Sequence, residues 1–125
     1  MFTYYSTFEN LSRHHGGWRI ARIPTGITTK RDLLAALAEA LSFPSYFGGN
    51  YDALWDCLCA LDGVSEYRVL LAHEDLPDLP EEELRVYIEI LYEALIFWET
   101  HYDEHIVTIA FPETARNGIA ALTDG

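Results

Sequence analysis

The sequence predicts an α/β fold, in which a small three-stranded parallel sheet is packed by about four helices. Three short runs of β-type residues alternate with segments whose apolar residues recur at helical spacing. The middle run, YRVLLA at 67–72, is apolar on both faces, as parallel strands covered by helices are. Strands and helices in this alternation join by right-handed crossovers, and 125 residues suffice for one such core.

The first elements follow from capping residues and side-chain alternation. Residues 1–17 are expected to form an N-terminal extension that docks on the domain, because their aromatic side chains need cover. The first strand is expected at 18–23, where apolar and polar residues alternate. Thr28 and Thr29 are candidate caps for the helix that follows, which should end near Ser42.

The second helix follows a turn rich in glycine. Asn50 is a good N-cap for it, and the helix should run to about Leu61. Asp62 and Gly63 then stop it, before the central strand at 67–72.

A long helix precedes the last strand. Asp78 is its candidate cap, Pro80 lies near its first turn, and the acidic residues 81–83 complement the helix dipole. Apolar residues fall on two sides of this helix, so both sides need partners. The last strand is expected at 105–111, and the C-terminal tail at 112–125 shows no strong pattern.

The charge balance is strongly acidic. Twenty Asp and Glu residues stand against eight Lys and Arg residues, which gives a formal net charge of −12 at pH 7. Such a surface repels nucleic-acid phosphates and attracts basic protein surfaces, so direct nucleic-acid binding is not expected. An acidic composition also simply keeps small proteins soluble, so a binding role requires a site.

The expected location follows from features that the sequence lacks. No signal-type start is present, and no apolar run reaches the roughly 18 residues that span a bilayer, so we expect a cytoplasmic protein without membrane association. Cys57 and Cys59 lie two apart in a predicted helix, where side chains point about 200° apart. No disulfide is therefore expected.

The helix that begins after Asn50 carries two aspartates on one exposed side. A step of 100° per residue places Asp52 and Asp56 together, opposite the leucines that face the core. Like charges four residues apart destabilise a helix by about 0.2–0.5 kcal/mol, so stability does not explain Asp56. These carboxylates could mimic phosphates for a basic pocket, although two solvated aspartates are also an ordinary feature of a helix surface. The residues on or beside this side are Tyr46, Tyr51, Asp52, Trp55, Asp56, Cys59 and Ala60.

Residues 44–58, PSYFGGNYDALWDCL, resemble the signature of the barstar family of ribonuclease inhibitors, Pro-x-Tyr-Tyr/Phe-Gly-x-Asn-x-Asp-Ala-Leu-Trp-Asp-x-Leu. This match joins a turn, a cap, a core stripe and an acidic side, and it is far more specific than a lone glycine motif. The resemblance extends more loosely over a barstar-like domain at 18–111, because the family fold is a three-stranded parallel sheet packed by helices. It implies that Asp56 enters the phosphate site of the ribonuclease and that Asp52 pairs with nearby basic groups. The resemblance implies a binding face made by Tyr46, Asn50, Tyr51, Asp52, Trp55 and Asp56.

Other residues are tied to the family less closely. An acidic residue on the last long helix also reaches the partner in the family, which makes Glu93 the best candidate here and Glu89 its neighbour. An ordinary solvated glutamate is equally compatible with that position. Cys59 and Ala60 stand with Leu61 where the type member carries Thr-Gly-Trp, so the cognate ribonuclease can differ, since rim contacts tune which enzyme fits.

No other chemistry is indicated. The five histidines show no recognised zinc spacing, so no metal is expected. No phosphate-binding loop or nucleophile elbow occurs, so no cofactor and no catalytic residue are expected. A carboxylate pair could in principle serve glycoside hydrolysis, but no cleft or substrate-binding pattern accompanies it.

The sequence therefore predicts a non-enzymatic, intracellular inhibitor of a basic ribonuclease of the extracellular or toxin type. It would act as an immunity or antitoxin protein by occluding the active site with its acidic helix, and it should be a monomer when free. The alternative is an acidic protein-interaction module on the same scaffold with a non-ribonuclease partner. A small hydrolase is a further rival, and it would show turnover without any protein partner.

Overall fold

The computed structural model describes residues 1–45 and 47–123 and shows an α/β fold built on one parallel sheet. The predicted parallel α/β architecture is confirmed. The strands of the described chain are β1 Thr3–Tyr5, β2 Arg19–Ile23, β3 Arg68–His73 and β4 Ile106–Pro112. The helices are α1 Phe8–Arg13, α2 Lys30–Ala40, α3 Tyr51–Leu58, α4 Glu81–Thr100 and α5 Arg116–Thr123, with a short 3-10 helix η1 at Glu113–Ala115.

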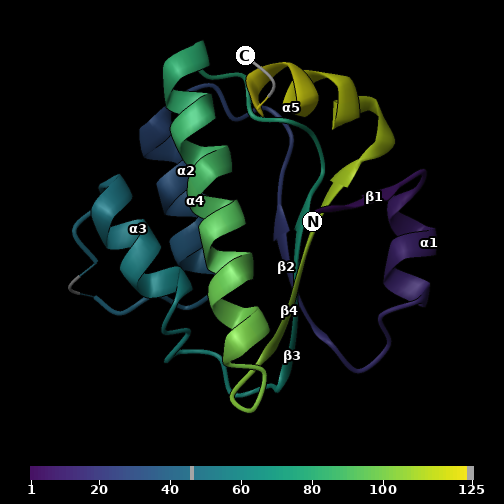
Figure 1. Ribbon diagram of the computed structural model, residues 1–125, viewed down its shortest axis with the longest axis vertical. Coiled ribbons are helices and arrows are strands. Elements are labelled where there is room, and N and C mark those ends of the chain that lie inside the picture. The colour runs from purple at the N-terminus through teal and green to yellow at the C-terminus, as the bar shows by residue number, and fades with distance from the viewer. Residues whose placement is uncertain (46, 124–125) are drawn as a thin grey trace.

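The sheet has the strand order β1-β4-β3-β2, and every neighbouring pair is parallel. Leu71 on β3 lies opposite Ala21 on β2 and Ile109 on β4. Helices α2, α4 and α5 cover one face with α3 beside α4, whereas α1 lies alone on the other face (Figure 1). The main core therefore lies on the side of the sheet that carries α3.

The prediction of three strands was wrong by one, because β1 adds a fourth. Thr3 lies opposite Ala110 of β4 in parallel register. The preceding Phe2 stacks on Tyr92 of α4 with ring centroids 4.2 Å apart, and its ring lies 5.2 Å from that of Phe111. The segment that we expected as a docked extension thus supplies an edge strand to the sheet.

The start of α4 differs from the prediction. Asp78 was expected to cap this helix, but Pro80 occupies the N-cap position and makes no side-chain cap bond. Proline is compatible with this position, because the N-cap backbone is extended, with φ −51° and ψ 143°, and proline favours φ near −65°. No helix within 1–45 and 47–123 could cross a bilayer, since even α4, the longest at 20 residues, carries many charged side chains.

The C-terminal tail at 112–125 contains structure that the sequence did not indicate. Residues 113–123 form η1 and then α5. Ile119 and Leu122 are buried in the main core, so this short helix closes the top of the molecule as drawn in Figure 1. With α1, it brings the described helices to five instead of about four.

His73 is a fully buried histidine at the end of β3. Its Nδ1 lies 3.1 Å from the carbonyl oxygen of Ala110, which can only accept, so Nδ1 carries the proton and donates. Its Nε2 then accepts from the hydroxyl of Tyr87, 2.5 Å away, and the imidazole stacks on Phe111 at 3.9 Å. This arrangement holds the ring neutral, because burial lowers the pKa of His73 to about 4.

We expect this histidine to make the fold acid-sensitive. An unfolded histidine has a pKa of about 6.5, so the unfolded state takes up the proton first as the pH falls. The contribution of His73 is therefore present above pH 6.5 and is lost as the pH falls toward 4, by about 3 kcal/mol in free energy of unfolding. Urea unfolding at several pH values should show a shallower loss in the double variant His73→Phe/Tyr87→Phe, whose carboxylates are unchanged. Equal slopes for the two proteins would contradict a neutral buried histidine.

Candidate functional site

Helix α3 is fixed at both ends. At its start, the side-chain Oδ1 of Asn50 accepts a hydrogen bond from the backbone N–H of Ala53 at 2.8 Å, which confirms Asn50 as the N-cap. Along its inner side, Leu54 and Leu58 are buried in the core. At its end, the indole N–H of Trp98 on α4 donates to the carbonyl of Leu58 at 2.8 Å. The helix is therefore a rigid platform for its outer side chains.

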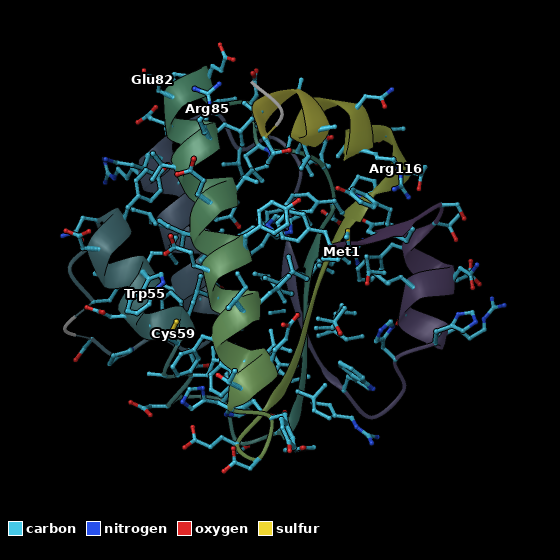
Figure 2. All side chains as sticks on the ribbon, viewed as in Figure 1. Met1, Trp55, Cys59, Glu82, Arg85 and Arg116 are labelled. Atoms are coloured by element: carbon cyan, nitrogen blue, oxygen red, sulfur yellow. The ribbon has the colours of Figure 1, made fainter. Side chains whose placement is uncertain are left out.

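The outer side of α3 carries Asp52 and Asp56, which we call the acidic ridge. Both side chains are exposed, and neither forms an ion pair with any residue that the structure describes. Trp55, labelled on α3 in Figure 2, lies next to Asp56 and keeps 38% of its surface exposed. Free carboxylates beside an exposed indole suit a protein contact, because aromatic anchors carry much of the binding energy at interfaces.

Tyr51 lies on the seam between α3 and α4. Its hydroxyl donates to the backbone carbonyl of Glu83 at 3.1 Å, and the ammonium of Lys30 lies 5.1 Å from the centre of its ring. Burial, with a smaller contribution from the charge of Glu83, raises the pKa of Tyr51 to about 12. The hydroxyl therefore stays protonated and ties α3 to α4.

Cys59 lies at the end of α3 that approaches α4 (Figure 2). Its side chain is half-buried, and burial together with the charges of Asp56 and Glu93 raises the pKa of its thiol to about 11. The carboxylates of Asp56 on α3 and Glu93 on α4 therefore both lie close enough to this thiol to disfavour its thiolate form. A protonated, half-buried thiol is a packing residue and a poor nucleophile.

A pocket of about 180 Å³ opens beside the acidic ridge. It lies between the segment that follows α2 and the C-terminal end of α3. Asp62, which the sequence indicated only as part of a helix stop, joins Asp56 at this pocket. The lining residues are Ser42, Phe43, Pro44, Asp56, Cys57, Ala60, Asp62 and Gly63.

Comparison with known protein families decides the classification of the chain. A family model described as Barstar (barnase inhibitor) matches residues 19–124 of the chain. The chain belongs to the barstar family. Members of the barstar family are inhibitors and not enzymes, so the predicted family and the predicted non-enzymatic role are confirmed. A search of curated proteins finds no match.

In this barstar-family protein, the residues predicted to bind a partner fall into three groups. The first group is exposed or half-exposed around the acidic ridge: Asp52, Trp55, Asp56, Cys59, Ala60 and Glu93, with the exposed Glu89 one turn before Glu93. The second group, Asn50 and Tyr51, uses its polar atoms to position α3. Tyr46 lies outside the described residues. The binding role of all these residues stays a prediction.

The part of the barstar-family site that the structure describes shows no further grouping that would indicate catalysis or cofactor binding. Among residues 1–45 and 47–123, no group of three or more His, Cys, Asp or Glu side chains is placed to hold a metal ion. Cys57 and Cys59 are both free thiols. The features of this site are therefore charge, an exposed indole and the adjoining pocket.

Proposed function

We propose that this protein inhibits a basic ribonuclease by seating the acidic ridge of α3 in the active site of the enzyme. The observation that carries the proposal is the pair of exposed carboxylates, Asp52 and Asp56, on a helix that the core holds rigid. Within the described residues no cation neutralises them, so their charge is available to a partner. Membership of a family of ribonuclease inhibitors supports the same proposal.

The mechanism is occlusion by charge and shape. An active site that cleaves RNA must attract phosphates, and two carboxylates at fixed spacing can take the place of those phosphates. The net charge of −12 steers the protein toward a basic enzyme and away from the RNA itself. Trp55 then supplies an apolar contact that is desolvated on binding, while Glu93 adds an acidic contact from α4.

The proposed setting is the cytoplasm of a cell that makes or receives the ribonuclease. The protein would act there as an immunity or antitoxin protein, as a free monomer that forms a one-to-one complex with an extracellular-type or toxin enzyme. It would bind no nucleic acid directly, because its surface repels phosphates.

The test is cleavage of a fluorogenic RNA by a panel of small basic ribonucleases, with and without this protein, at low and high ionic strength. We expect stoichiometric inhibition, with association that slows as salt screens the attraction. RNA cleavage by the protein alone would contradict the proposal and favour a hydrolase. If no enzyme of the panel is inhibited and an affinity pull-down recovers another kind of protein, the interaction-module alternative is favoured instead.

A further inference from the structure

The pocket beside the acidic ridge is preformed by close backbone contacts. A Cβ on Gly63 would stand 2.0 Å from the carbonyl oxygen of Ser42, so only glycine allows the two segments to meet. Ser42 and Leu61 adopt positive φ angles of 54° and 50°, and the N–H of Leu61 donates to the carbonyl of Cys57 at 2.9 Å. Because these walls exist before a partner binds, little conformational entropy is lost when the pocket is filled.

The size and lining of the pocket favour a single side chain as its occupant. Its volume of about 180 Å³ is below the roughly 300–1,000 Å³ of typical small-molecule sites. Phe43, Pro44 and Ala60 make it largely apolar, whereas Asp56 and Asp62 add carboxylates. A side chain with an apolar stem and a cationic end matches this distribution.

The carboxylates of Asp56 and Asp62 both line the pocket. Burial and the charges of Asp56 and Asp62 raise the pKa of the Cys57 thiol, which also lines the pocket. In the described part of the chain, neither aspartate forms an ion pair, and no Lys or Arg lines the pocket. The negative charge of the pocket is therefore not compensated by any residue within 1–45 and 47–123.

We propose that this pocket receives an arginine side chain of the ribonuclease partner, and that Asp62 is a specificity-determining residue of the interface. This inference rests on the proposed function, since the pocket is continuous with the acidic ridge through Asp56. A planar guanidinium can stack on the ring of Phe43 while its five donors reach two carboxylates. A lysine ammonium is a strongly hydrated point charge and gains less from an apolar wall.

Asp62 adds a second determinant of which ribonuclease the protein binds. It lies outside the signature at 44–58, which supplies Asp56 and the general attraction for a basic active site. A ribonuclease with an arginine at the matching position gains a contact at Asp62, whereas an enzyme without one leaves the carboxylate unpaired. The pocket thus discriminates among enzymes that Asp56 alone would accept.

The first test compares wild-type protein, Asp62→Asn and Asp78→Asn against a ribonuclease that the wild type inhibits. Asp78 is an exposed aspartate that precedes the first residue of α4. The hydrogen bond between Trp98 and Leu58, which joins α4 to the end of α3, lies near the opposite end of α4. We expect Asp62→Asn to raise Kd about tenfold and Asp78→Asn to change it less than about twofold at the same ionic strength.

The same assay separates this inference from the proposed function. Replacing the pocket's arginine in the ribonuclease by alanine should cause the same loss as Asp62→Asn, and combining the two changes should add little further loss. Equal Kd values for wild type and Asp62→Asn would overturn the assignment of the pocket. Loss of inhibition by Asp56→Ala in that experiment would still support the proposed function.

A second test needs no ribonuclease. N-acetylarginine amide and N-acetyllysine amide are titrated into the ¹⁵N-labelled protein, and backbone amide shifts are followed. We expect larger, saturable shifts with the arginine probe at Phe43, Ala60 and Gly63, reduced in Asp62→Asn. Equal shifts with both probes, or shifts unchanged in the variant, would overturn the inference, and this titration decides it even if no enzyme of the panel is inhibited.

Discussion

Asp56→Ala is expected to weaken binding to an inhibited ribonuclease by about 10²- to 4 × 10³-fold. Removing one partner of a buried ion pair costs about 3–5 kcal/mol, because the remaining charge stays desolvated without compensation. The fold should be unaffected or slightly stabilised, since Asp56 is exposed and its repulsion with Asp52 is removed. A large loss of affinity with an unchanged thermal midpoint is therefore the expected combination.

Stopped-flow association and an inhibition titration measure this effect. Glu39→Ala is a matched control, because it removes an exposed acidic side chain from α2 instead of α3. We expect the control to slow association slightly through its charge and to leave dissociation unchanged. If Asp56→Ala inhibits as well as the control, the acidic ridge does not contact the enzyme.

Gly63→Ala is expected to destabilise the protein by about 3 kcal/mol or more. The added Cβ would lie 2.0 Å from the carbonyl oxygen of Ser42, and a backbone atom cannot move aside as a flexible side chain can. The segments after α2 and after α3 would have to separate, which also disrupts the contacts of Leu61 with the core.

Urea unfolding compares this variant with Gly16→Ala. A Cβ on Gly16 meets no atom within 4 Å, so this control should change the free energy of unfolding by less than about 1 kcal/mol. The two variants differ only in the position of one methyl group. Similar stability for both would contradict the close approach of Gly63 to Ser42.

The elements that follow from local patterns were predictable, and the others depend on distant partners. Alternation and capping residues placed β2, β3, β4 and the start of α3 close to where the structure has them. β1 has three residues, too few for a periodic signal, and it is a strand only because Thr3 meets Ala110. The helix α5 likewise forms against a core that Ile119 and Leu122 help to complete.

The candidate site also combines features that local sequence patterns predict with features that depend on distant contacts. A 100° step per residue sufficed to place Asp52 and Asp56 on one exposed side of α3. That Tyr51 hydrogen bonds to the backbone of Glu83 could not be predicted, because the contact depends on how α3 packs against α4. Asp62 was missed for a related reason, since only the approach of Gly63 to Ser42 makes a pocket next to it.

The strand order also has a consequence for the time course of folding. β4 lies between β1 and β3. The strand that is synthesised last therefore connects β1 to the rest of the sheet. At about 5–20 residues per second, translation from residue 58 to residue 112 takes roughly 3 to 11 s. During that interval Leu54 and Leu58 lack much of the core that fixes α3, and only afterwards are the two carboxylates presented at their final spacing.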